Sequence, residues 1–271
     1  MYNKLLDTLF NCWLDELDEE SRNKFCMDGL MYKYGHPEPD VDKQWEMAKR
    51  RVMFLLKDNP DGEKQDTRTW LIDEKNGESV RNLSGGRVGK TGFLPNIARM
   101  LYGFLKTDIN SDYLPNFETV SVAKNEVKDV FNTAPFAFVE AKKNAGKSTV
   151  SSKEINAALN RDEIFLKKEI DILRPNIIVC CDADDEVFKF VTERYFLNAE
   201  PEKIEYKFGI WNGEKEVIEK GMKPCCLWYY PEHNVVVVKS YHPTRLGKGV
   251  WMVYERVISP FRKFLREHPN F

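Results

Sequence analysis

The chain lacks the features that would place it in a membrane or in an oxidising compartment. No apolar run among its 271 residues approaches the ~20 residues of a membrane-spanning helix. The first residues, Met1-Tyr2-Asn3-Lys4, do not carry the pattern of a signal peptide. The six cysteines include no Cys-x-x-Cys pair, which is a common spacing in metal and redox sites. We therefore expect a cytoplasmic protein without membrane contact, whose thiols are reduced and mostly buried.

A large net charge is also missing. The 41 basic and 43 acidic residues give a net charge of −2, so the chain as a whole is not a polycation. Charge is nevertheless uneven, because residues 1–40 are acidic and three windows are basic, at residues 87–106, 141–153 and 239–271. Each basic window alone is an ordinary solvated face, but three that converge would attract a polyanion. Glu163 and Glu169 are interpreted as surface charges.

Hydrophobic periodicity predicts alternating strands and helices. Four apolar runs have the length of buried strands, at residues 51–56, 135–140, 176–181 and 234–239. Helical spacing is found at residues 5–17, 42–51, 94–106, 152–173, 186–196 and 250–266. Strands that alternate with helices predict an α/β domain, in which helices cover both faces of a parallel sheet.

These elements predict a three-layer α/β/α fold around a short, mostly parallel sheet of four strands. The length allows one large domain or at most two. We assign residues 46–271 to the α/β domain and residues 1–45 to an N-terminal helical extension. Residues 198–232 are less regular, and Asn212-Gly213 predicts a hairpin turn within them.

Polar side chains follow each of the four predicted strands. The run Val235 to Val238 is followed shortly by His242-Pro243, and the first strand ends in Asp58-Asn59-Pro60. The carboxyl ends of parallel strands meet at one edge of the sheet, where open α/β sheets bind ligands. The alternative is that these segments are ordinary polar turns, with Asp184 acting as a helix N-cap after the third strand.

The ordered set of these motifs resembles that of the uracil-DNA glycosylase superfamily, over roughly residues 50–265. Asp58-Asn59-Pro60 is similar to the family's Asp-Pro or Asn-Pro motif, and His242-Pro243-Thr244 is similar to its His-Pro-Ser motif. Between them, residues 86–97 resemble its glycine- and phenylalanine-containing loop, and residues 138–155 with 170–181 resemble its basic loop, helix and following strand.

The resemblance implies a DNA glycosylase that hydrolyses the N-glycosidic bond of a flipped, deaminated or damaged base, without a metal or another cofactor. Asn59 matches the residue that positions or activates the attacking water, and Asp58 beside it is the stronger base. His242 matches the donor to the base carbonyl oxygen, a type of contact worth about 3–4 kcal/mol. The implied base-binding residues are Pro60, Phe93 and Asn144.

The same resemblance implies a set of contacts to DNA. Leu246 falls where the family has an apolar wedge, and Thr244 replaces a serine and would hold a phosphate. Extruding a base costs a few kcal/mol, which the wedge and contacts to phosphates would offset. The implied DNA-binding residues are Lys142, Lys143, Lys147, Thr244, Arg245, Leu246 and Lys248.

The sequence departs from the family pattern at three strand ends. Lys57 stands where the family has a small glycine, and Asp182 replaces another glycine. The second strand ends with Glu140 and Lys142 in place of a base-reading asparagine, although Asn144 is close by.

Two other functions fit parts of the sequence. Residues 141–148 match a relaxed phosphate-binding loop, and Asp182 would then bind magnesium in a nucleotide hydrolase. That mechanism needs a helix that begins at the loop, whereas Ser151-x-x-Glu154 predicts a capping box and a later start. The other alternative is a non-catalytic nucleic-acid-binding protein of the same fold, since a fold does not imply its function.

Overall fold

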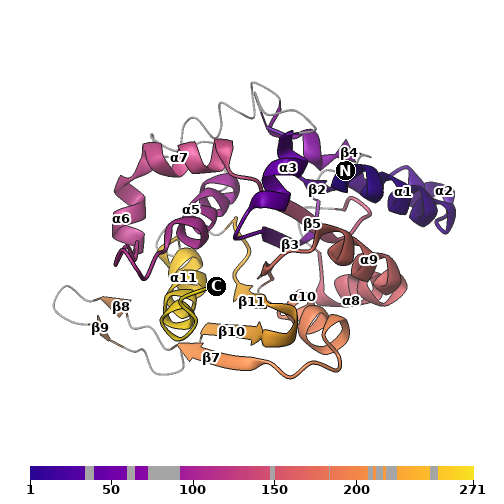
Figure 1. Cartoon of the computed structure of the whole chain (residues 1–271). Coiled ribbons are helices and arrows are strands. Elements are labelled where there is room, and N and C mark those ends of the chain that lie inside the picture. Colours follow the sequence, from indigo (N-terminus) through magenta and orange to yellow (C-terminus); the bar gives the residue numbers. More distant parts are fainter. Residues whose placement is uncertain are drawn as a thin grey trace.

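The computed structural model describes residues 1–33, 40–59, 65–72, 92–146, 150–182, 184–206, 210–211, 216–217, 225–244 and 250–271. It shows a mixed α/β fold with a mostly parallel central sheet (Figure 1). No helix within these ranges is long and apolar enough to cross a membrane.

The central sheet contains the four predicted strands at its middle. In sheet order these are β5 (Ala137–Lys142), β3 (Val52–Asp58), β6 (Ile177–Cys181) and β11 (Val235–Ser240), and each neighbouring pair is parallel. Antiparallel strands extend both edges, with β2 (Gly29–Leu30) beside β5, then β10 (Cys225–Tyr230) and β7 (Glu202–Tyr206) beyond β11. The described sheet therefore has seven strands, not the four predicted.

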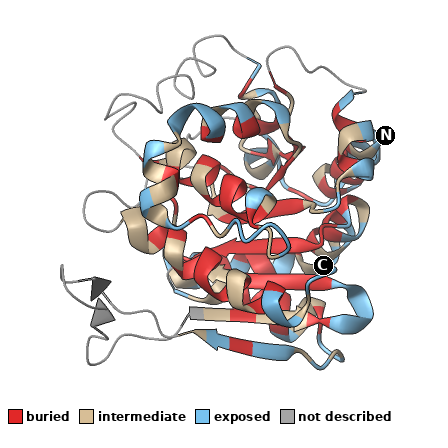
Figure 2. Cartoon of the chain, turned by 60° about the vertical axis from the view of Figure 1, so that its left-hand side comes forward, coloured by how far each residue is buried: buried red, intermediate tan, exposed pale blue. Residues whose placement is uncertain are grey.

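The parallel strands are apolar throughout because both of their faces are covered. Val236, Val237 and Val238 are fully buried, as are Ile177 and Ile178 on the neighbouring strand. Successive residues enter two different cores, one on each face of the sheet. Figure 2 shows that burial concentrates on these strands and on the sides of the helices that face them.

Helices pack against each core. The first core receives α5 (Phe93–Lys106), α6 (Phe117–Val122), α7 (Lys124–Thr133) and α11 (Val250–Glu267). The second receives α1 (Tyr2–Asp15), α3 (Asp40–Met47), α8 (Ser152–Arg161), α9 (Glu163–Leu173), α10 (Glu186–Lys189) and the π-helical η3 (Phe190–Tyr195). The helix predicted over residues 152–173 is divided at Asp162, which ends α8 and precedes α9.

Short elements complete the described chain. They are α2 (Glu19–Arg22), β1 (Cys26–Met27), β4 (Gln65–Asp66), η1 (Thr67–Thr69), β8 (Ile210–Trp211), β9 (Glu216–Val217) and η4 (Pro231–His233). Strands β8 and β9 pair antiparallel on either side of the predicted Asn212-Gly213 turn, which itself lies outside the described residues.

The N-terminal segment shares a core with the sheet. Helix α1 buries Leu6, Phe10 and Trp13 in the same core as strand residues of β5 and β6. The Trp13 indole nitrogen donates to Asp162 Oδ1 at 3.1 Å, and its ring stacks on Phe165 with centroids 5.0 Å apart. A domain boundary after residue 45 stays a prediction, but these contacts tie α1 to the junction of α8 and α9.

Replacing Trp13 with alanine is expected to lower the free energy of unfolding by about 3–5 kcal/mol, the usual cost of removing a large buried aromatic side chain. Chemical denaturation monitored by circular dichroism measures the change. Leu5→Ala is the matched control on the same helix, because Leu5 is 48% exposed and should change stability by less than about 0.5 kcal/mol. An unchanged main transition in Trp13→Ala would show that residues 1–45 unfold independently.

Candidate active site at the carboxyl edge of the sheet

The carboxyl ends of the parallel strands bring most of the described candidate residues to one edge. Strand register pairs Leu56 with Glu140, and Asp58 with Lys142. Residues two apart on a strand face the same side, so all four lie on the face of the first core, as does Phe138. His242 follows β11 two residues after Ser240. Strands β3 and β11 both pair with β6, which separates their ends by about 10 Å.

Asp58 is an enclosed carboxylate with a lysine partner. Its Oδ2 lies 3.3 Å from Lys142 Nζ, and the two side chains are only 8% and 17% exposed. Lys142 Nζ also donates to the Asn144 carbonyl oxygen at 2.6 Å. Burial raises the pKa of Asp58 above its ordinary value, and the charge of Lys142 opposes that rise. Asp58 is therefore a stronger base than an exposed aspartate.

The loop after β5 closes tightly over the end of β3. The Gly146 N–H donates to the Asn59 carbonyl oxygen at 2.9 Å. A β-carbon at Gly146 would lie 2.6 Å from Asp58 Oδ2 and 2.8 Å from Lys142 Nζ, so only glycine fits without a shift. Asn59 itself is 2% exposed. The side chain of Asp58, the other residue predicted to handle water, lies on the face shared with Phe138.

His242 is held in one tautomer by Thr244. Its Nδ1 accepts from the Thr244 backbone N–H at 3.3 Å and lies 2.8 Å from the Thr244 hydroxyl oxygen. Because a backbone N–H only donates, Nδ1 carries no proton, and the neutral ring keeps its proton on Nε2. Burial and the charge of Lys57 lower the pKa of His242, while Asp182 opposes that change. The side chain is thus a neutral donor through Nε2.

Helix α5 holds an aromatic ring beside this histidine. Phe93 is the first residue of α5, and its ring centroid lies 6.2 Å from that of His242 and 5.9 Å from that of Phe138. Three residues later, Asn96 donates from Nδ2 to the Pro243 carbonyl oxygen at 2.7 Å in a buried hydrogen bond. This bond fixes the loop of His242 to the first turn of α5. Sequence analysis missed Asn96, although a polar residue on an otherwise apolar helix face was a usable signal.

Lys57 and Asp182, which differ from the glycines of the superfamily that the sequence resembles, pair with each other. Lys57 Nζ lies 3.5 Å from Asp182 Oδ1 and 3.0 Å from Asp184 Oδ2. Burial opposes the charge of Lys57, but these carboxylates outweigh burial and raise its pKa. Asp182 also accepts the backbone N–H groups of Asp184 and Val187, at 2.9 and 3.1 Å. Asp182, not Asp184, therefore caps the start of α10.

These contacts remove the support for a phosphate-binding loop. The aspartate proposed to bind magnesium is fully buried and occupied by Lys57 and by backbone N–H groups. Helix α8 begins at Ser152, and Ser151 with Glu154 closes its N-terminus in the predicted capping box. The helix N-terminus that would bind a phosphate next to the loop is thus already capped.

Lys143 is not a DNA-binding residue, and that prediction is wrong. The side chain is fully buried, and its Nζ lies 2.6 Å from both carboxylate oxygens of Asp28 and 2.8 Å from Glu169 Oε2. Glu169 is fully buried as well, so its interpretation as a surface charge is also wrong. An ammonium enclosed by two carboxylates has no route to a phosphate.

Glu140 adjoins the same buried group. The Glu140 backbone N–H donates to Asp28 Oδ2 at 2.7 Å. Glu140 as a whole is only 7% exposed. Burial and the charge of Asp28 raise the pKa of Glu140 to about 8. Burial likewise raises the pKa of Glu169, and nearby Asp28 adds to the effect. Lys143 pairs with Asp28, and burial favours the protonated form of both glutamates.

The other predicted residues divide into two groups. Thr244 is exposed, and Asn144 is half-buried with its Oδ1 enclosed and without a hydrogen-bond partner among the described residues. The remaining predicted residues lie outside the described residues; they are Pro60, Lys147, Arg245, Leu246 and Lys248.

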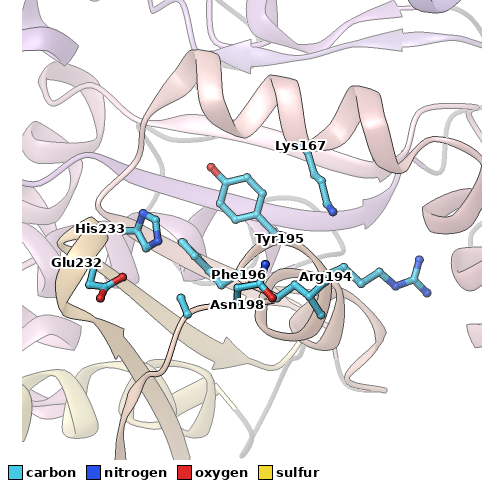
Figure 3. A pocket seen from close by; sticks show the side chains of 9 residues that line it. Lys167, Arg194, Tyr195, Phe196, Asn198, Glu232 and His233 are labelled. Carbon is cyan, nitrogen blue, oxygen red and sulfur yellow. The ribbon is translucent and has the colours of Figure 1, made fainter.

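A separate cavity of about 400 Å³ lies near the opposite end of β11. Figure 3 shows Tyr195, Phe196 and His233 around it, with Lys167 on the helix above and Arg194 extending away. Three of its polar side chains already have partners, since Lys167 and Arg194 both contact Glu163 and the Tyr195 hydroxyl donates to Asp171. The two basic side chains of the cavity are therefore already paired with a carboxylate.

Comparisons with known proteins do not assign the chain to a family or a function. No protein-family model matches the sequence, and no curated protein is significantly similar to it. Within the described part of the chain, no three His, Cys, Asp or Glu side chains gather closely enough to hold a metal ion.

Replacing Lys143 with methionine is expected to lower the free energy of unfolding by about 3–5 kcal/mol, because Asp28 would be left as a buried charge without its partner. Chemical denaturation at pH 7 measures this loss. Lys153→Met is the matched control, since Lys153 is exposed and lies in the same basic window. A Lys143→Met protein of unchanged stability but weakened DNA binding would restore the original prediction.

Stability is expected to depend on pH through Glu140. The unfolded side chain ionises near 4.5 and the folded one near 8, so ionisation of the unfolded state destabilises the fold as pH rises between these values. The glutamine of Glu140→Gln cannot ionise. The free energy of unfolding of this variant, relative to that of the wild type, should therefore rise by about 2–4 kcal/mol between pH 5 and 8, since one pKa unit corresponds to about 1.4 kcal/mol. Denaturation of both proteins at each pH tests this. A constant difference would mean that Glu140 is already ionised in the folded protein.

Proposed function

We propose that this protein is a DNA glycosylase that hydrolyses the N-glycosidic bond of a flipped, uracil-like base. The observation that carries the proposal is the fixed tautomer of His242, whose Nδ1 is occupied by Thr244 and whose Nε2–H is a donor. A donor of this kind stabilises negative charge as it develops on the carbonyl oxygen of a departing base.

The chemistry that we propose uses Asp58 and His242 on opposite sides of one substrate. The bond between the sugar C1′ and the base nitrogen breaks, and the base leaves with the bonding electrons. Negative charge develops on the base carbonyl oxygen, where the His242 Nε2–H donates a hydrogen bond. A water oxygen bonds to C1′, and Asp58 takes the released proton as general base. The ends of β3 and β11 lie on either side of β6, about 10 Å apart, so the substrate would bind across the carboxyl end of β6.

The aromatic residues support a base-binding role for the same region. Phe93 lies beside His242 and Phe138, and rings of this kind stack on an extruded base. The Asn96 hydrogen bond to the Pro243 carbonyl keeps the stacking ring and the donor in a fixed relation. Preorganisation of this type matters because a small displacement of either group would weaken the interaction in the transition state.

The proposal includes the finer description of the fold. Helices on both faces of the parallel strands agree with a three-layer member of the uracil-DNA glycosylase superfamily, as does the order of the strand-end motifs. Contacts to DNA phosphates would then come from Thr244 and from Lys147, Arg245 and Lys248, with Leu246 as the wedge. Lys142 contributes less than predicted, because Asp58 already pairs with its charge. A cytoplasmic location remains part of this proposal.

A non-catalytic nucleic-acid-binding protein is the second candidate. The observation that favours it is the close packing around Asp58, where Lys142 and Gly146 enclose one carboxylate oxygen. A paired carboxylate of this kind organises a loop without any need for catalysis.

Base release from an oligonucleotide that contains one uracil distinguishes the two candidates. For the glycosylase, His242→Ala is expected to lower the rate of release by about 100- to 1000-fold, the loss typical of one preorganised donor. His233→Ala is the matched control, because His233 is exposed and lies near the opposite end of β11. If the wild-type protein binds the oligonucleotide but releases no uracil or other damaged base, the non-catalytic candidate is correct.

A further inference from the structure

The Glu140 carboxyl group lies in the candidate site and makes no hydrogen bond to the described residues through Oε2. The residue is 93% buried. The contact with Asp28 uses the Glu140 backbone N–H and leaves the side chain unused. Leaving a buried polar atom without a partner costs free energy, so such an atom calls for an explanation.

The strand register places this carboxyl group on the proposed base-binding face. Glu140 lies between Phe138 and Lys142 on the same side of β5. Phe138 contacts the Phe93 ring, and Lys142 contacts Asp58. The side chain of Glu140 thus lies between the aromatic ring proposed to stack on the base and the carboxylate proposed to activate water. Nearby Asn144 has a second enclosed oxygen, Oδ1, with no partner among the described residues.

We propose that the side chain of Glu140 hydrogen-bonds the polar edge of the base bound beside Phe93 and His242, and thereby selects the base. This inference rests on the proposed glycosylase function and assigns its specificity residue. In this arrangement the enclosed Oε2 of Glu140 has a hydrogen-bond partner only when the substrate is bound. A polar group that is unpaired until the correct ligand arrives discriminates strongly, because the wrong ligand leaves it unpaired.

The protonation state defines which edge is accepted. A neutral carboxylic acid offers one donor and one acceptor, so it matches a base edge with one acceptor next to one donor. Uracil presents such an edge at its O4 and N3–H. An ionised carboxylate offers acceptors only and would instead match two adjacent donors, as on guanine. Since the Glu140 carboxyl group keeps its proton at neutral pH, the site should accept a uracil-like edge and reject that of guanine.

Several charged or ionisable groups act on Glu140 and bear on its pH dependence. They are Asp28 after β1, Asp58 on β3, and Lys142 and Lys143 on or next to β5. Cys181 on β6 also interacts with Glu140, but burial raises the pKa of this thiol and keeps it neutral. The two lysines favour ionisation of Glu140, and the two aspartates oppose it together with burial.

Binding without catalysis gives the most direct test. The probes are two otherwise identical oligonucleotides, one with 2′-fluoro-2′-deoxyuridine, whose glycosidic bond resists hydrolysis, and one with a base-free tetrahydrofuran site. Wild-type protein should prefer the uracil-containing probe in fluorescence anisotropy. Glu140→Leu should lose about 10- to 100-fold of that preference, the range expected for hydrogen bonds in a buried site, with unchanged affinity for the base-free probe.

Two further variants separate recognition from folding. Glu140→Gln keeps one donor and one acceptor, so it should retain the preference to within about threefold. Its preference should also persist above pH 8, where the wild-type preference declines as Glu140 ionises. Glu163→Gln removes a carboxylate of α9 that contacts Lys167 and Arg194, outside the Lys143 network, and should leave the preference unchanged. Thermal unfolding of each variant confirms that it is folded.

The outcomes distinguish failure of this inference from failure of the proposed function. If Glu140→Leu is folded and keeps the full preference for uracil, Glu140 does not read the base, while the glycosylase proposal stands. If the wild-type protein releases no uracil and does not prefer the uracil-containing probe, the proposed function fails and this inference fails with it. Loss of preference in Glu140→Leu together with its retention in Glu140→Gln supports the inference.

Discussion

The buried ammonium of Lys143 is the contact on which the geometry of the candidate site depends. It holds Asp28, which follows β1, and Glu169, which lies on α9, against the end of β5. Asp28 in turn accepts the backbone N–H of Glu140. One internal charge therefore fixes three segments behind the strand end that carries Glu140 and Lys142. Breaking a buried pair of this kind is costly because the remaining carboxylate stays in a medium of low polarity.

The candidate site combines this buried network with the ends of three other strands. Asp58, Asp182 and His242 each follow or terminate a strand, and each is held by a contact from another segment: Lys142, Lys57 and Thr244, respectively. The pair formed by Lys57 and Asp182 is informative, because both residues depart from the glycines of the family that the sequence resembles. These two side chains contact each other, so a charged pair occupies the space between the ends of β3 and β6.

The central strands and most helices could be predicted because burial on both faces leaves a continuous apolar pattern, as in Val235 to Val238. Strands β10 and β7 were not predicted: β10 is apolar but lies within the segment at residues 198–232 that was interpreted as irregular, and the edge strand β7 lacks a continuous apolar pattern. In β7 only Ile204 is buried, so the surrounding glutamates and lysine gave it the appearance of a loop. Candidate residues at the strand ends could be found because parallel strands share one edge. The role of Lys143 could not, since its partner Asp28 is 115 residues away in sequence and a lysine within a basic window resembles a surface residue.

The Trp13–Asp162 hydrogen bond has a consequence for how the chain folds during synthesis. Its two residues are 149 positions apart, and the partners of Lys143 are almost as widely separated. Helix α1 leaves the ribosome before α9, so the surface that buries its apolar side is completed only after α9 has been made. Contacts between such distant residues form slowly, and exposed apolar surface in the meantime favours association with other chains. The apolar side of α1 therefore stays uncovered until α9 has been synthesised, and in that interval it is a surface that a chaperone could bind.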